Sequence, residues 1–334
     1  MRFSGHRMDP HNGHGGQVAE GISLGVPVGV SSGAPFRVAA MRFTSILLSA
    51  PLLLSCAAST VAAEGGNDAP EGSGAAHSVV AVYDPTTFRL CTGTLVTTRA
   101  VLTAAHCGSS PGRSLLIVFT THAAGHLATA PSLPASHFEP SPAWAEGHDK
   151  PWDRGDVAIA ILDGEPPSPY HPAPLVAVGE GPGYWRHHRR TMVAGYGSTS
   201  HDRNVGAGHL HQAQLTSQVW EWSATELLAN DERVGACEGD SGAPLFLTLP
   251  SGELAVSSLV SRSLLSYGPQ LCSHRFGLTK LGTYRAWIDE VLDKQHAGRA
   301  RWLPASPAFA AAPEGNDMVG VDEVRRATQR KDGL

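Results

Sequence analysis

The chain is poor in charged residues, and neither sign predominates. Lys, Arg, Asp and Glu make up 16% of its 334 residues, and the formal net charge is −5. The sequence contains no basic stripe, so nucleic acid is not expected as a partner. It does contain 37 Gly and 24 Pro. That composition favours many short strands joined by turns over long surface helices.

Cysteine is scarce, and its spacing does not suggest a metal site. The chain has five cysteines and no C-x-x-C pair, so a zinc site built from cysteines is not predicted. Histidine is more abundant, with 17 residues, but His187–His188 and His209/His211 lie in polar, turn-like sequence. We interpret them as solvated loop histidines rather than metal ligands. No metal and no other cofactor is predicted.

The apolar run Phe43–Leu54 is too short to span a membrane, and it follows a short basic region at Met41–Arg42. This pattern is typical of a signal peptide over residues 41–62. The preceding residues 1–40 show no sustained periodicity, and we expect a disordered leader or a start codon placed too early. Export would place the mature protein in an oxidising compartment, as a secreted, periplasmic or cell-surface protein.

Two processing sites compete at the end of this segment. Leu53–Cys56 resembles a bacterial lipobox, in which Cys56 would be lipidated and would anchor the protein to a membrane. Val61–Ala63 instead offers the small residues that an ordinary signal peptidase recognises. The first site would give a lipid-anchored protein and the second a freely secreted one.

Short alternating runs bounded by Gly and Pro predict strands in the middle of the chain. They lie at residues 77–83, 90–97, 114–120, 192–196, 243–249 and 254–261. An amphipathic helical pattern occupies residues 283–292. The proline-containing region 131–155 is expected to be a long loop that Trp144 and Trp152 pack beneath, although they could instead flank a cleft. Residues 294–334 are rich in Ala, Pro and charge, which predicts a flexible tail.

The stretch Cys237–Pro244, with the sequence CEGDSGAP, places a serine where a nucleophile would be useful. A serine hydroxyl needs a neighbouring base, an oriented partner for that base and donors for the oxyanion. The backbone N–H groups of Gly239 and Ser241 could point at such an oxyanion. Taken alone, the same string could be a tight surface turn. Two strings upstream, Leu102–Cys107 (LTAAHC) and Asp156–Ala160 (DVAIA), favour the catalytic interpretation.

These three boxes, in the order His, Asp, Ser, resemble those of the trypsin/chymotrypsin family of serine endopeptidases. Further matches at Cys91–Leu95, Gly195–Gly197 and Tyr284–Ile288 extend the resemblance over residues 63–293. The resemblance implies an all-β fold of two six-stranded antiparallel β-barrels, with the active site in the cleft between them and a C-terminal helix. It also implies a polypeptide substrate and a monomeric enzyme, here of a bacterial, secreted or lipid-anchored kind.

In this family the three boxes carry the catalytic triad. By resemblance, Ser241 would attack the scissile carbonyl, His106 would accept and return its proton, and Asp156 would stabilise the imidazole cation. Gly239 and Ser241 would supply the N–H groups of the oxyanion hole.

The resemblance also implies two disulfides. Cys91 would pair with Cys107 and tie the strand before the active site to the turn that carries the histidine. Cys237 would pair with Cys272 and brace the nucleophile loop against a wall of the substrate pocket. In a loop-entropy account, each bridge contributes about 3–4 kcal/mol by constraining the unfolded chain.

Asp240 has a separate role in the family, where it pairs with the ammonium of a newly cut N-terminus that begins Ile-Val-Gly-Gly. Here the matching stretch is Ala63–Gly72, with Ala63–Glu64 in place of the apolar pair and no Arg or Lys before it. A tryptic activation cut is therefore not predicted. We hypothesise instead that signal peptidase, by cutting after Ala62, produces an N-terminus able to reach Asp240.

The residues expected in the substrate pocket argue against cleavage after Arg or Lys. Gly235 lies six places before the nucleophile, so no buried carboxylate would pair with a basic side chain. Phe276 falls where the family usually keeps a glycine, and it would shorten the pocket. Ser261 would pair with the substrate backbone, although Ser261–Ser263 (SRS) departs from the usual Ser-Trp-Gly. Small or apolar residues before the cut are predicted.

The sequence thus predicts a serine endopeptidase that works through an acyl-enzyme. The alternative is a catalytically silent, protease-like binding or adhesion module, which the unusual activation terminus and the altered pocket favour. An esterase of the α/β-hydrolase type is disfavoured, because Ser241 lacks a G-x-S-x-G elbow and comes last of the three residues.

Overall fold

The computed structural model describes residues 66–108, 114–147, 150–177, 191–200, 205–217, 219–249, 251–264 and 272–303. All of them lie in one compact unit, Ala57–Leu334. The expectations about the leader, the signal peptide, Cys56 and residues 304–334 fall outside the described residues.

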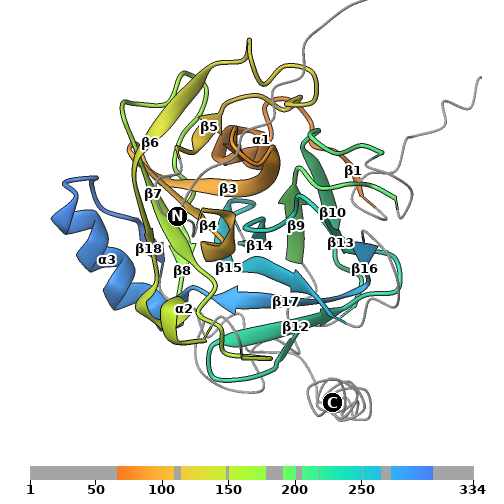
Figure 1. Cartoon of the computed structure of the whole chain (residues 1–334). Helices are drawn as coiled ribbons and strands as arrows, with labels where there is room; N and C mark the ends of the chain where they lie inside the picture. The colour runs from red at the N-terminus through yellow and green to blue at the C-terminus, as the bar shows by residue number, and fades with distance from the viewer. Residues whose placement is uncertain are drawn as a thin grey trace, which may run out of the picture. The chain divides into compact units, whose positions relative to one another are not determined.

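The described chain consists mainly of short strands, in the arrangement of Figure 1. The strands are β1 (Asn67–Asp68), β2 (Val79–Asp84), β3 (Arg89–Thr97), β4 (Ala100–Thr103), β5 (Leu116–Val118), β6 (Ser132–Pro140), β7 (Ala158–Leu162), β8 (Leu175–Val176), β9 (Thr191–Gly195), β10 (His211–Gln214), β11 (Val219–Glu221), β12 (Glu226–Asn230), β13 (Ala236–Cys237), β14 (Pro244–Thr248), β15 (Leu254–Ser263), β16 (Cys272–Ser273), β17 (Arg275–Lys280) and β18 (Trp302–Leu303). The helices are α1 (Gly74–Ser78), α2 (Pro142–Gly147) and α3 (Arg285–Lys294), with 3₁₀ turns η1 (Ala105–Cys107) and η3 (Gly282–Tyr284).

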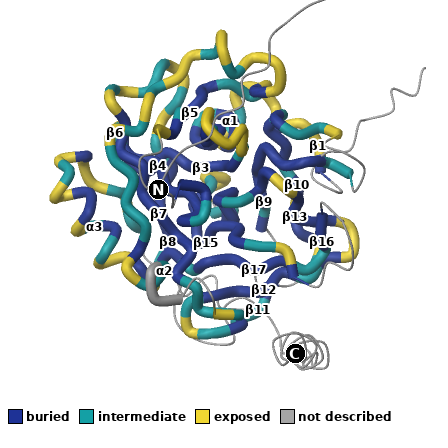
Figure 2. The backbone as a smooth tube through the Cα atoms, in the orientation of Figure 1, coloured by how far each residue is buried: buried dark blue, intermediate teal, exposed yellow. Residues whose placement is uncertain are grey.

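Six strands of the first half close into an antiparallel barrel in the order β2-β3-β4-β7-β6-β5. Successive residues of a strand point to opposite faces. Val80 and Val82 accordingly belong to a core cluster formed by this half alone. Val79 and Ala81 belong to a cluster that also contains residues of the second half. Figure 2 shows the resulting buried strands. The barrel is thus apolar on both faces, and the second half packs against its outer face.

The second half is a larger sheet. Its main path runs β1-β10-β9-β14-β15-β17-β12-β11, and β8 and β18 join it at β15. The expected pair of six-stranded barrels is therefore confirmed for the first half, while the strands described in the second half form an open ten-stranded sheet. A separate pair, β13 with β16, places Cys237 opposite Cys272.

The expectation of a long loop over 131–155 is wrong for its first part, because β6 and α2 occupy it. β6 pairs with both β5 and β7 despite its prolines. The carbonyl of Pro134 still accepts a hydrogen bond from Asp163 N at 3.0 Å, and the register shifts between Ala135 and His137. Proline has no backbone N–H to donate to a neighbouring strand. A strand therefore tolerates proline where its register shifts and no donor is required.

The predicted C-terminal helix is confirmed as α3, whose apolar side chains Ile288, Val291 and Leu292 are buried. The prediction of a flexible tail from residue 294 onward is wrong for its first part, because β18 pairs with β8 after α3. Trp302 Nε1 also donates to Asp289 Oδ1 at 2.8 Å. Among the described helices, none is long and apolar enough to cross a membrane.

Candidate active site

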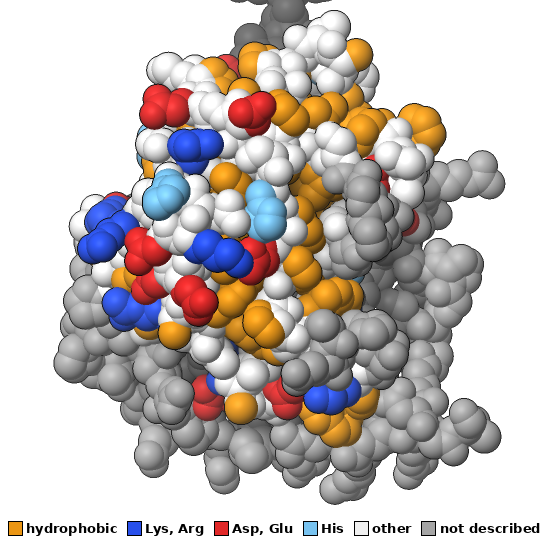
Figure 3. Space-filling model, turned by 60° about the vertical axis from the view of Figure 1, so that its left-hand side comes forward, with side chains coloured by type: hydrophobic (Ala, Val, Ile, Leu, Met, Phe, Trp, Pro, Cys, Tyr) orange, Lys and Arg blue, Asp and Glu red, His pale blue; other side chains and the backbone are white. Residues whose placement is uncertain are grey.

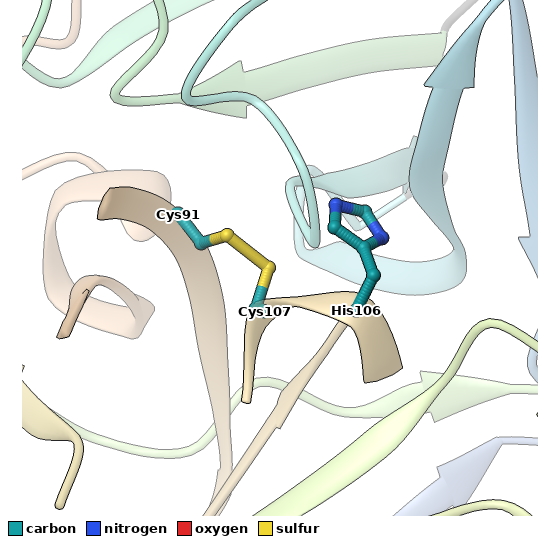
Figure 4. Close-up of side chains that lie close together, drawn as sticks. All are labelled: Cys91, His106 and Cys107. Atoms are coloured by element: carbon teal, nitrogen blue, oxygen red, sulfur yellow. A yellow bond between two sulfur atoms is a disulfide. The ribbon is translucent and has the colours of Figure 1, made fainter. Parts of the chain in front are cut away.

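The histidine box forms the end of β4 and the 3₁₀ turn η1. Thr103 ends the strand fully buried, and its hydroxyl donates to Thr92 O at 2.7 Å. The chain then turns, and His106 emerges from η1 with 22% of its side chain exposed. Cys107, on the same turn, is joined to Cys91 of β3 by a disulfide. Figure 4 shows the disulfide on one side of the turn and the imidazole on the other.

The structure brings together the three residues that the sequence boxes single out. His106 Nδ1 lies 2.8 Å from Asp156 Oδ2, and His106 Nε2 lies 2.8 Å from Ser241 Oγ. His106 N also donates to Asp156 Oδ1 at 3.1 Å. One imidazole therefore bridges a carboxylate and a hydroxyl that are far apart in the sequence.

Asp156 lies in an interior site with several donors. Its side chain is 2% exposed, and Ser261 Oγ donates to Oδ2 at 2.6 Å. Burial by itself raises the pKa of this carboxyl. The hydrogen bonds from His106 and Ser261, and the charge of His106, outweigh burial, so the pKa lies below its ordinary value. Asp156 is therefore held as a carboxylate beside the imidazole.

The loop that carries Ser241 requires glycine at two positions, one before and one after the serine. Gly239 has φ +102° and Gly242 has φ +82°, both in the left-handed region. A Cβ at Gly242 would lie 2.2 Å from Thr92 O, and one at Gly239 would lie 2.8 Å from Gly197 Cα. The loop is therefore pressed against β3 and against the segment after β9.

Thr92 of β3 fastens this loop. Thr92 N donates to Ser241 O at 2.8 Å, and Thr92 Oγ1 donates to Gly239 O at 2.9 Å. Within the described residues, the N–H groups of Gly239 and Ser241 donate no hydrogen bond. Two backbone donors beside the nucleophile are thus available to an oxyanion.

Asp240 is buried behind the nucleophile. Its carboxylate accepts hydrogen bonds from Gly197 N at 2.9 Å and from Cys237 N at 2.8 Å. Burial raises its pKa to about 7, and these two N–H groups only partly oppose the rise. No cation pairs with it in the described part of the chain. Residues 63–65, which include the proposed mature N-terminus, lie outside that part.

The expected pocket residues come from three places in the chain: Gly235 directly precedes β13, Ser261 lies on β15 and Phe276 on β17. Gly235 is buried between Val234 and Ala236. Phe276 on β17 is fully buried, and it belongs to the same apolar cluster as Val234 and Ala236. Ser261, expected to pair with substrate, has its hydroxyl on Asp156. The structure therefore gives Ser261 a contact that the sequence did not predict.

A cavity of about 350 Å³ lies on another side of Ser241. Ser241 and Gly239 line it together with apolar residues such as Phe88 and Leu127 and with the charged residues Arg89 and Glu238. Phe88 is 78% exposed and has φ +58°. Non-glycine residues in the left-handed region are uncommon and cluster at functional sites.

Trp144 flanks the site, with its ring centroid 6.3 Å from that of His106. Trp152 packs against a buried cluster that contains Trp222, Leu228 and Leu264. The two tryptophans, alike in sequence context, thus have different surroundings.

The interpretation of His209 and His211 as solvated is wrong for His211, which β10 buries between β1 and β9. Its Nε2 lies 3.0 Å from Gly206 O, and its Nδ1 lies 2.9 Å from Asp68 Oδ1. Burial lowers its pKa, although both of these neighbours oppose that shift. His187 and His188 lie outside the described residues.

The described residues give no support for a metal centre at the site. Cys91, His106 and Cys107 form the one group there whose donor atoms lie within 4.8 Å of one another. Both sulfurs belong to a disulfide and are not thiolate ligands. A second disulfide joins Cys237 to Cys272 beside the nucleophile loop.

Charge does not segregate on the face that Figure 3 shows, where acidic and basic side chains are interspersed. Exposed ion pairs occur on and after α3, among them Arg285–Asp289 and Arg299–Asp293. The larger cavity of about 430 Å³ lies between α3 and residues 298–302, and none of the triad residues lines it.

Comparison with known proteins gives the family. The profile of the family described as "Trypsin" matches residues 63–288, which is more than half of the chain. The chain therefore belongs to the trypsin family, and it is a serine-type endopeptidase. Enzymes of this family act on polypeptides.

Two relatives illustrate the range of this similarity. Granzyme M of Rattus norvegicus is 28% identical over 231 residues, which cover 64% of this chain and 81% of that protein. Transmembrane protease serine 9 of Rattus norvegicus is 25% identical over 241 residues, which cover 67% of this chain but 21% of that protein. The chain thus spans about a fifth of the second relative.

Two residues near the site had no role assigned from the sequence. Thr92 lies within the stretch Cys91–Leu95, and the signal that points to it is its position next to Cys91. Arg262 is visible in the sequence only as a departure from the family pattern. Its partner Glu226 carried no signal in the sequence, because one acidic residue in a strand gives no indication of burial.

Proposed function

We propose that the chain hydrolyses peptide bonds through an acyl-enzyme formed on Ser241, with His106 as general base and acid. The observation that carries the proposal is the imidazole of His106, which lies 2.8 Å from both Ser241 Oγ and Asp156 Oδ2. His106 Nε2 takes the hydroxyl proton as Oγ attacks the carbonyl carbon. It then returns the proton to the leaving amine.

Asp156 supports the cationic imidazole formed in each step. Its pKa lies below the ordinary value, so it remains a carboxylate while His106 carries the extra proton. The N–H groups of Gly239 and Ser241 bind the oxyanion of the tetrahedral intermediate. One such donor is worth about 10²- to 10³-fold in rate.

The preferred residue before the cut is small or apolar. Gly235 contributes no carboxylate at the base of the pocket, and the fully buried Phe276 occupies an apolar cluster next to it. A buried carboxylate would be needed to compensate a Lys or Arg side chain taken out of water. The cavity beside Gly239 and Ser241 leaves room for a further part of the polypeptide substrate.

The cellular location of this activity is inferred from the N-terminal sequence. We propose export through residues 41–62, with the mature enzyme of a bacterial type, monomeric, and either secreted or lipid-anchored through Cys56. In the secreted form, cleavage after Ala62 gives an N-terminus that pairs with Asp240. Mass spectrometry of the exported protein tests this, and a mature chain that begins at Cys56 contradicts the Ala62 cut.

A fluorophosphonate probe tests the proposed chemistry. The probe should label Ser241 in correctly processed protein, and labelling should be lost in the S241A and H106A variants, with S217A as a control that keeps it. A catalytically silent binding module, the alternative function, would leave Ser241 unmodified in the wild-type protein. Hydrolysis of a peptide library would then give the residue preference before the cut.

A further inference from the structure

Arg262 and Glu226 form a buried ion pair next to the triad. Arg262 Nη1 donates to Glu226 Oε1 at 2.8 Å, and Arg262 Nη2 donates to Glu226 Oε2 at 2.7 Å. Glu226 is 1% exposed and Arg262 is 14% exposed. Removing two charges from water costs about as much as their attraction returns, so stability alone does not account for such a pair. Its other contacts indicate what it does.

The pair holds the segment that leads into Asp156. Arg262 Nη2 donates a second bond to Pro151 O at 2.7 Å. Arg154 N donates to Glu226 Oε1 at 3.2 Å. Both members of the pair therefore bind backbone groups of residues 151–154. The bidentate geometry of guanidinium and carboxylate fixes their directions as well as their distance.

A third link reinforces this attachment. Asp153 accepts hydrogen bonds from Thr225 Oγ1 at 2.6 Å and from Thr225 N at 3.3 Å, and also from Ser223 Oγ. Its φ of +55° lies in the left-handed region, which a neighbouring tertiary contact must stabilise. The segment before Asp156 is thus tied at three points to β15 and to the β11–β12 hairpin.

Arg262 also acts on the hydroxyl that contacts Asp156. Arg262 Nη1 lies 3.5 Å from Ser261 Oγ, and Ser261 Oγ lies 2.6 Å from Asp156 Oδ2. A donor that faces the hydroxyl oxygen leaves its proton directed at the carboxylate. Arg262 therefore reaches Asp156 by two routes, one through the backbone of residues 151–154 and one through Ser261.

We propose that Arg262, with Glu226 as its counter-ion, is a positioning residue for the triad: it fixes the carboxylate of Asp156 against His106. This inference rests on the proposed function, and it assigns a role to a position where the family usually has tryptophan. An indole offers one N–H and no charge, so it cannot make the four contacts of the guanidinium. At this position the chain therefore has a charged, hydrogen-bonded guanidinium in place of an aromatic side chain.

The test uses full-length, processed protein. R262M leaves Glu226 buried without its partner and is expected to unfold more readily, so the informative variant is R262M/E226L, which fills the site with apolar side chains. K280M is the matched control, because Lys280 also pairs with a carboxylate two strands away in the same sheet, that of Glu221 at 3.3 Å. R262K keeps the charge but not the bidentate fork.

The readouts are kcat and KM for an ester substrate, the pH profile of kcat/KM, and the low-field proton resonance of the His106–Asp156 hydrogen bond. R262M/E226L should lower kcat about 10- to 100-fold, the effect of a shift of about 1 Å in a catalytic group. KM should change by less than about 3-fold, because substrate contacts are kept. The acid limb should move to lower pH, since a displaced carboxylate stabilises the cationic imidazole less. R262K should recover part of the loss, and K280M should match the wild type.

A folded R262M/E226L protein with wild-type kcat, pH profile and resonance would overturn the inference. Failure of the proposed function looks different, because the wild type itself would then show no turnover and no probe labelling. In that case the resonance still reports whether the double variant has moved Asp156 relative to His106.

Discussion

Ser261 Oγ donates a hydrogen bond of 2.6 Å to Asp156 Oδ2, on the same oxygen that faces His106 Nδ1. The carboxylate is therefore held from two sides by groups of different elements, β15 and η1. The hydroxyl of Ser261 contributes to keeping Asp156 ionised, because a hydrogen bond to the charged form lowers a carboxyl pKa.

The S261A variant should be less stable by about 1.5–3 kcal/mol at neutral pH, the range for a hydrogen bond to a charged group. A carboxyl with a lowered pKa contributes stability above its unfolded pKa, and the contribution is lost as pH falls through the folded pKa. The deficit of S261A should therefore shrink in acid. Urea unfolding at pH 7 and pH 3 measures it. S257A, which removes a bond to the neutral carbonyl of Leu245, should lose about 1 kcal/mol at both pH values.

In a protein whose chain extends before Ala63, we expect Asp240 to make the free energy of unfolding depend on pH with the opposite sign. Its pKa is raised to about 7, so between pH 4 and pH 7 the folded state binds more protons than the unfolded state. The free energy of unfolding should therefore fall as pH rises, by about 4 kcal/mol at most, and D240N should abolish this fall. D231N is the control, because the pKa of Asp231 is lowered and its contribution disappears in acid.

The same titration separates the two mature forms. An ammonium that pairs with Asp240 favours the carboxylate, so a chain that starts at Ala63 should lose the fall in stability. Identical profiles for the extended and the Ala63 form would contradict the proposed pairing.

Phe276 should limit the size of the residue accepted before the cut. F276A opens space beside Gly235 and should raise kcat/KM for phenylalanine over alanine at that position by about 10-fold or more. It should also lower stability by about 3–5 kcal/mol, as Phe→Ala substitutions in cores do. Cleavage of matched peptides measures the preference. F246A, in a different buried cluster, should cost similar stability and leave the preference unchanged.

Thr92 should affect the reaction through the nucleophile loop. T92V removes the hydroxyl that donates to Gly239 O and accepts from Tyr196 N, so kcat should fall by about 10-fold as the oxyanion donors shift. T94V is the control on the same strand, because Thr94 Oγ1 is buried with no hydrogen-bond partner among the described residues. T94V should keep wild-type kcat and be at least as stable. Equal kcat for both variants would mean that Thr92 only supports the fold.

The residues of the proposed triad could be read from the sequence, because each lies in a short box whose local conformation is fixed by its own residues. The 3₁₀ turn that carries His106 and the two glycines beside Ser241 are examples of such locally determined conformations. Asp240 could be located as well, and among the described residues it accepts only the hydrogen bonds of Gly197 N and Cys237 N.

The sequence did not predict contacts that depend on distant pairing. Arg262 and Glu226 carry no local signal, and Thr92 carries only its position next to Cys91, because their contacts form only when distant parts of the chain come together. The prolines of region 131–155 predict a loop, yet the barrel strand β6 accommodates them where its register shifts. His211 looked solvated because its polar neighbours are conspicuous in sequence, whereas pairing with β1 and β9 decides its burial.

β18 returns after α3 and pairs with β8, a strand of two residues that itself pairs with β15. Any shortened version of the protein that ends before Arg301 would uncover backbone groups of Leu175 and Val176, because Leu175 N donates to Arg301 O at 2.9 Å and β18 pairs with both residues. Such an unprotected strand border recruits other chains. Recombinant versions trimmed behind the helix are therefore expected to self-associate, and those that retain Leu303 to stay dispersed.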